Sequence, residues 1–416
     1  MTTKKDAIRV TILNQYYVPD VASTGHLLHE LANHLAKRGD DVHVIACIPS
    51  YGPPDTWQPA PRKEFAEGVH VRRMRTTRFS KDSIPGRVLN SITFLVPLFF
   101  RMLFRRRNDH VYLYTTNPPY LGIIGAVVSL IRRHPYVILL HDSYPQLAVW
   151  VGKIRKGGII DRLWHRANRL MYHRAKETIV LCPSAQHLVC DTYDVPESKV
   201  HVIPNWADAE GIHPIPKSDS RFAHKHGLVE PFVALYSGNL GLYYEFETIL
   251  GAAERLLDDN FRLVFIGAGG RRFFIEQQIR DRSLSNTMLL PYQPFATLND
   301  SLNASDASFV TIAEGIEGIS FPSKLYSSLA VGRPILAISA ARSDLRDIIE
   351  GGNAGVWVEL GDADGLAAGI RRLMESPELS AEMGRNARAL FEAEYTIMKC
   401  AGEYHDVLVR ARPETG

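Results

Sequence analysis

The sequence predicts an α/β protein made of two doubly wound domains, and three observations support this. The chain has 416 residues, which at roughly 150 residues per domain makes two or three domains. Short apolar runs alternate with amphipathic helical patterns in two separate series, as is typical of parallel sheets. A segment rich in Pro, Asp and Ser, residues 204–220, separates the two series.

The first series begins with a β-α-β unit. Residues 9–14 (RVTILN) are expected to form a buried strand, the leucine-rich stretch from about Gly25 a helix that Gly39 closes, and residues 41–46 the next strand. Short apolar strands on both sides of a helix imply parallel pairing. The pattern recurs in HVYLY, YVILLH, ETIVLC and HVIP, the last of which ends at Pro204.

The second series repeats this alternation. A helix is expected over about residues 245–257, and the helical stretch 381–409 is longer than the second sheet requires. Ligands are expected at the carboxyl ends of the strands and in the cleft between the domains. The predicted strands lie in FVALYSGN, RLVFIGAGG, TMLLP, ASFVTI, PILAIS and GVWVEL.

Composition excludes several classes of protein. With 45% apolar and 22% charged residues, the chain lacks the signature of disorder, collagen or a multi-span membrane protein. The four cysteines form no C-x-x-C pair, which argues against zinc sites, redox motifs and a disulfide framework. The first residues lack a signal-peptide pattern, so a cytoplasmic location is expected.

The two halves of the chain carry opposite charge. Residues 1–205 hold 28 Lys/Arg against 16 Asp/Glu, a net charge of +12, and the remainder has a net charge of −9. The first half is expected to face nucleic acid or a lipid headgroup surface, unless its basic face is simply solvated.

Two uncharged segments invite a test for membrane spans. Residues 88–100 are too few and include Pro97, and residues 111–131 are broken by Asn117 and two prolines, so neither is expected to span. The first segment fits either a helix lying on an anionic bilayer surface or a core helix with a solvated end. Its candidate membrane contacts are Arg101, Arg105, Arg106 and Arg107.

Several loops have the composition of anion sites. Thr24 and Gly25 precede a helix, Gly238 and Asn239 follow a strand, and the start of another helix carries Ser323 and Lys324. Free amides at such positions, with one ammonium, can hold a diphosphate without a metal ion. Taken singly, each also fits an ordinary helix cap or turn.

Another candidate pair, His141 and Asp142, follows a strand at its carboxyl end, where α/β sheets bind ligands, although a simple turn is the alternative. Motifs for dinucleotide binding, zinc proteases and serine hydrolases are missing from the sequence. The one Asp-x-Asp, Asp362 and Asp364, is expected to cap a helix and not to bind a metal ion.

The order of motifs resembles that of the retaining glycosyltransferases of family 4 over nearly the whole chain. The branch it is most similar to builds bacterial capsule, O-antigen (lipopolysaccharide) and colanic-acid-type polysaccharides. The motifs that carry the resemblance are YVPDVASTG, TTNPPYLG, LLHDSYP, VIPNWAD, YSGNLG, VFIGAGG, LLPYQP, PSKLYSSLAVGRPIL and GDADGLAAGI.

The resemblance implies the GT-B fold, in which two Rossmann-like doubly wound domains face each other across a cleft. Residues 1–205 would be the membrane-facing acceptor domain, 206–390 the nucleotide-sugar domain, and 391–416 a helix crossing back to the first. The reaction would be retaining and would need no metal or other cofactor. A sugar would pass from a UDP- or GDP-sugar to a sugar on a polyprenyl diphosphate, by a peripheral enzyme on the cytoplasmic face of the inner membrane, with no nucleic acid involved.

By the same resemblance, the catalytic residues would be His141, Lys324 and Glu317, with Asp142 on the acceptor side. The chain departs from the family pattern where Asn239 replaces an arginine and where Ile319 and Ser327 replace two glutamates. The implied donor-binding residues are Thr24, Gly25, Gly238, Asn239, Tyr292, Gly318, Ser323, Leu325 and Ser327.

Two other functions remain open at this stage. A nucleotide-sugar epimerase could use the same fold, and the missing glutamates are compatible with a catalytically silent, membrane-associated scaffold. A nucleic-acid-binding protein is disfavoured because the basic half has no recognisable reading module.

Overall fold

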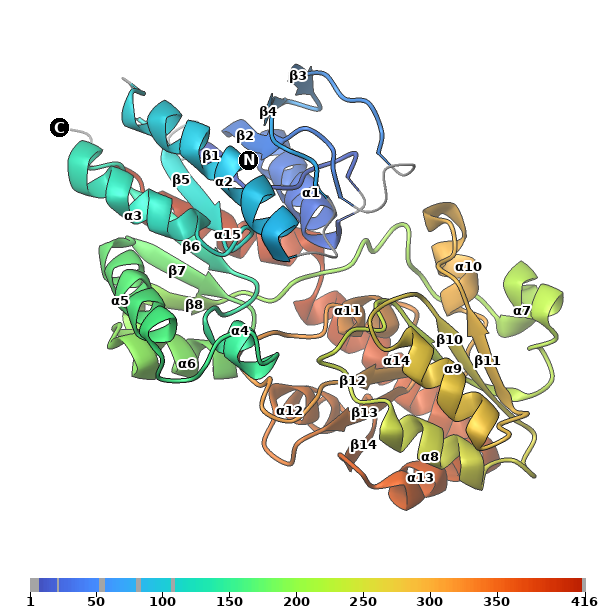
Figure 1. Ribbon diagram of the computed structural model, residues 1–416. Helices are drawn as coiled ribbons and strands as arrows, with labels where there is room; N and C mark the ends of the chain where they lie inside the picture. Colours follow the sequence, from blue (N-terminus) through green and yellow to red (C-terminus); the bar gives the residue numbers. More distant parts are fainter. Residues whose placement is uncertain (1–6, 21, 52–56, 80–83, 106–108, 414–416) are drawn as a thin grey trace. The chain divides into compact units, whose positions relative to one another are not determined.

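The computed structural model describes residues 7–20, 22–51, 57–79, 84–105 and 109–413. The chain divides into two compact units, which Figure 1 shows in the colours of the sequence. The N-terminal unit comprises Met1–Pro204, Gly318–Ser320 and Ile397–Gly416, and the C-terminal unit comprises Asn205–Glu317 and Phe321–Thr396.

The N-terminal unit contains an eight-stranded sheet in the order β3-β4-β2-β1-β5-β6-β7-β8. All pairs are parallel except β3 with β4, which form an antiparallel hairpin. The strands are β1 (Arg9–Leu13), β2 (Asp41–Cys47), β3 (Lys63–Ala66), β4 (Val69–Met74), β5 (Val111–Thr115), β6 (Tyr136–Leu140), β7 (Glu177–Val180) and β8 (Val200–Val202).

The hairpin is the part of this sheet that the sequence did not predict. β3 is mostly exposed and β4 alternates between buried and half-buried or exposed residues, so neither forms an apolar run. Its turn uses Glu67 and Gly68, both at positive φ, where Asn-Gly or Asp-Gly would be the usual signal.

Helices cover both faces of this sheet. α1 (Ser23–Lys37) packs against α15 (Ile397–Arg410), while α2 (Ile84–Leu103), α3 (Leu121–Arg132) and α5 (Ile159–Arg174) follow one another as neighbours on the other face (Figure 1). The shorter α4 (Gln146–Trp150) and α6 (Pro183–Tyr193) complete the unit. The C-terminal helix α15 is held partly through Asp40, whose carboxylate lies 3.5 Å from His405 Nε2 and accepts the Ile8 N–H at 2.9 Å.

Helix α2 is longer than the uncharged run that the sequence shows. Among the described residues it is the one helix long and apolar enough to cross a bilayer, judged by length and composition. One of its faces is nevertheless buried: Phe94, Leu98 and Met102 have no exposed surface, and the helix packs against α3. The expectation that α2 lies on a bilayer without crossing it stays a prediction.

The C-terminal unit contains a parallel six-stranded sheet in the order β11-β10-β9-β12-β13-β14, and each of its strands matches a strand predicted from the sequence. The strands are β9 (Phe232–Ser237), β10 (Phe261–Ile266), β11 (Thr287–Leu290), β12 (Ala307–Thr311), β13 (Ile335–Ser339) and β14 (Gly355–Glu359). The helices are α7 (Arg221–His226), α8 (Glu247–Arg255), α9 (Arg272–Asp281), α10 (Leu298–Leu302), α11 (Lys324–Ala330), α12 (Asp344–Gly351), α13 (Ala363–Glu375) and α14 (Pro377–Glu394).

Three helix boundaries differ from the expectation. Helix α1 begins two residues before Gly25, and the helix expected over 245–257 is the shorter α8. The single long helix expected over 381–409 is wrong: α14 and α15 are separate. The break has a physical cause, since Thr396 forms a β-bridge with Ala207, whose N–H also donates to Tyr395 O at 3.3 Å.

Candidate active site

The two central strands of the C-terminal sheet mark its point of reversal. β9 and β12 are neighbours, and the chain runs from β9 outward to β11 on one side and from β12 outward to β14 on the other. In doubly wound sheets the carboxyl ends of such strands are where ligands bind. The loops that leave this edge begin at Gly238 and Ile312.

Lys324 lies at this edge with a buried ammonium group. Its Nζ lies 3.4 Å from the ring centroid of Tyr244 and 4.5 Å from that of Tyr236. Among the described residues Nζ has no hydrogen-bond partner, although it carries three donors. Burial lowers the pKa of Lys324 well below its ordinary value. The aromatic rings stabilise the cation but leave its N–H groups without an acceptor.

Glycines bring the neighbouring loops into backbone contact. A Cβ on Gly267 would overlap the Gly238 carbonyl oxygen, and a Cβ on Gly269 would overlap the Leu240 carbonyl oxygen. The Leu240 N–H donates to Ala268 O at 2.9 Å, which ties the loop after β9 to the loop after β10. A Cβ on Gly238 would lie 3.5 Å from Lys324 Cε, so the expected pair of Gly238 and Lys324 is brought together.

The serines at the start of α11 do not cap the helix in the usual way. Ser323 is exposed and makes no side-chain cap bond, and the Ser327 hydroxyl donates to Lys324 O at 3.1 Å. Leu325, another expected donor-binding residue, has a fully buried side chain, and its N–H donates to Pro322 O at 3.1 Å.

Three other expected site residues lie on loops of this edge, Asn239 and Tyr292 as donor-binding candidates and Glu317 as a catalytic candidate. The Asn239 carbonyl accepts from Tyr236 Oη at 2.8 Å, and the half-exposed Tyr292 lies over the loop after β10, with its Oη 3.4 Å from Ala268 O. Glu317, from the loop after β12, has its buried Oε1 without a hydrogen-bond partner in the described part of the chain.

In the N-terminal unit, His141 and Asp142 follow β6 as expected. Both backbone N–H groups donate to Thr116 Oγ1, at 3.2 and 3.3 Å. The His141 Nε2 is buried and has no partner in the described residues, and burial lowers the pKa of this histidine to about 4. Its imidazole is therefore neutral at neutral pH.

Asp142 lies in an environment that disfavours its charge. Burial raises the pKa of its carboxyl group, against the opposing effect of a hydrogen bond with Ser320. The segment that includes Ser320 is held by Ser143, whose N–H donates to Ile319 O at 2.7 Å. Gly318 in the same segment has φ +71, and a Cβ there would lie 2.5 Å from Ser184 O.

Thr24 and Gly25 lie in the first turn of α1, not in a loop before it. The Gly25 N–H donates to Ala22 O at 2.9 Å, and a Cβ on Gly25 would lie 3.3 Å from Tyr16 O. Gly25 thus lets the helix start approach the loop after β1.

Of the candidate membrane contacts, Arg106 and Arg107 lie outside the described residues. Arg105 bonds to His110 Nε2 at 2.7 Å, and Arg101 is half-buried. The expected cap at Asp362 is confirmed, because its side chain accepts the Gly365 N–H at 2.8 Å.

Sequence reasoning missed the aromatic rings around Lys324. Tyr236 is part of an apolar strand and Tyr244 part of an irregular loop, so neither carries a pattern that indicates a cation site. Thr116, which orients the His141 and Asp142 backbone, was missed for the same reason.

The comparisons with known proteins assign both units. Residues 24–206 match the family model described as "Glycosyl transferase 4-like domain", and residues 219–390 match "Glycosyl transferases group 1". The chain belongs to glycosyltransferase family 4. With its two parallel-sheet α/β units, this glycosyltransferase has the GT-B fold that the motifs implied.

Relatives and solved structures agree with this assignment. The enzyme is 25% identical to the probable glycosyltransferase WbjE of Pseudomonas aeruginosa, over 82% of this chain and 83% of that protein. It is also 25% identical to the putative colanic acid biosynthesis glycosyl transferase WcaI of Escherichia coli, over 89% and 93% of the two chains. In fold it is similar to sucrose-phosphate synthase from Thermosynechococcus elongatus, with a TM-score of 0.77, 16% identity and 96% and 98% coverage. Anabaena HepE in complex with UDP gives a TM-score of 0.72, 16% identity and 96% and 99% coverage.

The backbone contact between the loops after β9 and β10 can be tested by substituting Gly267. Gly267→Ala forces the loops after β9 and β10 apart, because the new Cβ would overlap the Gly238 carbonyl, and it should cost about 3 kcal/mol or more. Gly361→Ala is the matched control: Gly361 also has positive φ, but nothing lies within 4 Å of its Cβ position, so the cost should be only about 1 kcal/mol. Urea unfolding of the two variants measures the difference, and equal costs would contradict the loop contact.

Proposed function

We propose that this glycosyltransferase acts in the biosynthesis of a bacterial surface polysaccharide. It would move a hexose or amino sugar, with retention of configuration, from a UDP- or GDP-sugar to a saccharide on a polyprenyl diphosphate. The name of its relative WcaI, which refers to colanic acid, supports the pathway class. The fold shared with HepE, whose structures hold UDP and UDP-glucose, supports a nucleotide-sugar donor.

The buried ammonium of Lys324 is the observation that carries the proposal. An unpaired cation inside a protein is costly unless a ligand supplies the missing acceptors. Transfer from a nucleotide sugar leaves a diphosphate whose negative charge grows in the transition state. A fixed ammonium at that place stabilises the transition state more than the ground state and so accelerates the reaction.

The proposal includes transfer without a divalent cation, which accords with the types of residue at the site. Lys324 and the peptide amides of the glycine loops would take the place of the ion. Within the described residues, the one group of three side chains with the spacing of a metal site is Asp41, His43 and His70, in the N-terminal unit. Activity that persists in excess EDTA supports this part of the proposal, and activity restored only by added Mg²⁺ or Mn²⁺ contradicts it.

His141 and Asp142 would serve the transfer from the N-terminal unit. A neutral imidazole can exchange hydrogen bonds with sugar hydroxyl groups without adding positive charge. As pH falls from 6.5 toward 4, the unfolded chain takes up a proton that folded His141 resists, so the folded state loses stability.

His141→Asn should therefore reduce transfer strongly and also reduce the loss of stability between pH 6.5 and 4. Thermal melts across this range measure the second effect. If the melts of the variant and the wild type shift equally with pH, His141 is not buried as a neutral group.

Lys324→Met tests directly whether the buried ammonium group takes part in the transfer. Transfer should fall by about 100-fold or more, whereas the melting temperature at neutral pH should not fall, because the variant no longer buries an unpaired charge. Lys225→Met, at an exposed lysine in α7 of the same unit, is the matched control and should change neither. Unchanged transfer in Lys324→Met would remove this residue from the mechanism.

The protonation of Lys324 gives an independent readout of donor binding. A diphosphate beside the ammonium favours the charged form, so the lowered pKa of Lys324 rises when UDP or GDP binds, and the protein takes up a proton at a pH between the pKa values of the free and bound states. Calorimetry in two buffers of different ionisation enthalpy measures this uptake. Lys324→Met should show none; equal uptake in the variant would assign the proton to another group.

Incubating the nucleotide sugar with and without a polyprenyl diphosphate sugar tests the function as a whole. A glycosylated acceptor supports the proposal. A donor converted to its epimer without acceptor would show an epimerase, and failure to bind any UDP or GDP compound would show a catalytically silent protein.

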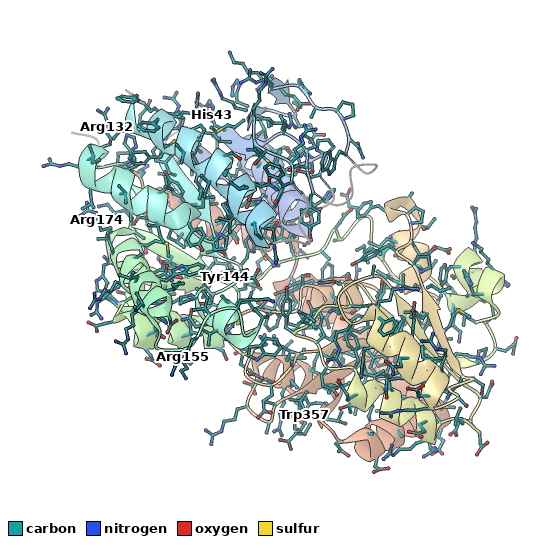
Figure 2. The ribbon with its side chains drawn as sticks, viewed as in Figure 1. His43, Arg132, Tyr144, Arg155, Arg174 and Trp357 are labelled. Carbon is teal, nitrogen blue, oxygen red and sulfur yellow. The ribbon has the colours of Figure 1, made fainter. Side chains whose placement is uncertain are left out.

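A peripheral position on the cytoplasmic face of the membrane is also part of the proposal. Along the α2-α3-α5 face, large apolar side chains are exposed, and Arg132 and Arg174 are among the basic residues on this side of the unit (Figure 2). This combination suits an anionic bilayer surface. The exposed apolar residues are Val88, Leu89, Ile92, Val96 and Phe100 of α2, Leu130 and Ile131 of α3, and Ile159, Ile160, Leu163 and Leu170 of α5.

A further inference from the structure

A cavity of about 790 Å³ lies in the N-terminal unit, between the β3-β4-β2 edge of the sheet and the end of α2. Its lining is rich in basic and aromatic side chains. Its basic side chains are Lys63, Arg72, Arg101 and Arg105, and its rings include His43 (Figure 2) and Phe100.

This cavity is not part of the candidate active site. His43 and His70 are paired near the amino ends of the parallel strands β2 and β4, whereas His141 and Asp142 follow the carboxyl end of β6. The cavity also reaches Ile45 and Arg72 in the middle of these strands, but it lies at the β3-β4-β2 edge of the sheet, three strands from β6, and so is separate from the catalytic candidates.

The charges around the cavity are unbalanced. Lys63 and Arg72 stand directly opposite each other across the β3-β4 pair, and α2 and the turn after it contribute Arg101 and Arg105. Glu64 is the one carboxylate among the described lining residues, and it already accepts a hydrogen bond from Arg73 Nη1 at 2.7 Å. Four cations therefore face the cavity with little counter-charge.

The unbalanced charge affects Arg101 most clearly. Its Nε is buried without a hydrogen-bond partner among the described residues. Burial, together with repulsion from Arg72 and Arg105, lowers its pKa. Arg105 is held in place, since it bonds to His110 Nε2 and its guanidinium lies 5.7 Å from the Tyr112 ring centroid. A bound anion would relieve the repulsion and supply the missing acceptor.

The same surroundings disfavour a metal ion, although Asp41, His43 and His70 have the spacing of a metal site. The Asp41 carboxylate is already shared between Arg9 and His43 Nε2, the latter at 2.9 Å. A divalent cation would have to displace these partners and then remain beside Arg72 and Arg105.

The aromatic residues indicate that the anion carries hydrocarbon. Phe100 and Phe104 are 51% and 74% exposed, and their rings are stacked with centroids 6.4 Å apart. They end a row of exposed apolar residues at four-residue spacing on α2, which begins with Val88, Ile92 and Val96. Residues four apart are neighbours on the surface of a helix, so the row forms a continuous apolar strip that winds slowly around α2, and the basic cavity lies at its end.

We propose that this cavity binds the phosphate headgroup of an anionic phospholipid, whose acyl chains belong to the bilayer on which the apolar strip of α2 rests. The inference rests on the bilayer contact of the proposed function but not on sugar transfer. A bilayer lipid fits better than the acceptor lipid, because the cavity is at the β3-β4-β2 edge of the sheet, three strands from β6, which His141 follows. The site would fix which edge of the unit faces the membrane.

The test uses the full-length protein and cosedimentation with vesicles, either of phosphatidylcholine alone or of equal parts phosphatidylcholine and phosphatidylglycerol. Arg72→Gln/Arg101→Gln should weaken binding to the anionic vesicles by about tenfold or more. The same variant should melt no lower than the wild type, because it removes repulsion between buried charges. A merely structural role for the arginines predicts the opposite shift.

Lys37→Gln/Arg38→Gln is the matched control. It removes two cations from exposed positions at the end of α1, on the other face of the sheet, and should retain nearly wild-type binding. Equal losses in the two double variants would overturn the proposal, because only overall charge would then matter. Tight binding of glycerol phosphate in solution, with vesicle binding unchanged by Arg72→Gln/Arg101→Gln, would also overturn it and assign the cavity to a free phosphate compound.

Phe100→Ser/Phe104→Ser separates the hydrocarbon contribution from the charge. It should weaken vesicle binding even at high salt, where surface electrostatic attraction is screened; binding equal to wild type would contradict the apolar strip. Affinity for UDP or GDP should be unchanged in all of these variants. If the wild-type protein does not bind UDP or GDP, the proposed function fails, but the lipid site is not affected by that result.

Discussion

The chemistry of the C-terminal unit depends on one buried ammonium group, which has no anionic partner in the part of the chain that the structure describes. Tyr236 and Tyr244 place aromatic faces beside the Nζ of Lys324, which partly offsets the loss of hydration but cannot accept three hydrogen bonds with the strength of an anion. The free protein therefore holds Lys324 in an unfavourable state. A bound diphosphate would supply the hydrogen-bond acceptors that the Lys324 ammonium lacks. The empty site therefore costs stability, but it is preorganised for the negative charge that develops during transfer.

Position, more than composition, makes that arrangement possible. Lys324 begins the helix after β12, and Gly238 begins the loop after β9, the two strands at which the sheet reverses direction. Gly267 and Gly269 then let the loop after β10 touch the loop after β9 backbone to backbone. Peptide groups are thereby fixed near the ammonium, and a side chain at either glycine would separate them.

Residue patterns predict the parts of this structure that local physics determines. Apolar runs between helices give the strands of both sheets apart from the β3-β4 hairpin, and their carboxyl ends give His141, Gly238 and Lys324. The hairpin could not be predicted from the sequence, because β3 is mostly exposed and its turn is Glu-Gly. The split between α14 and α15 escapes because its cause is a bridge from Thr396 to Ala207, nearly 200 residues away in the sequence. The roles of Tyr244 and Thr116 could not be predicted for the same reason, because they arise from contacts that only the folded chain creates.

The two ends of the N-terminal sheet have opposite electrostatic character. At the carboxyl end, burial keeps His141 neutral and raises the pKa of Asp142, which suits contact with uncharged sugar hydroxyl groups. Toward the amino end, Arg101 and Arg105 lie close to Arg72 and Lys63 of the β3-β4 pair, and these four charges have little compensation. Helix α2 connects these ends, since it follows β4 at the carboxyl edge and precedes β5 at the amino edge. A phosphate held at one end of α2, with the apolar strip on the bilayer, would therefore keep the neutral end of the sheet beside the membrane surface, where a lipid-linked saccharide is presented.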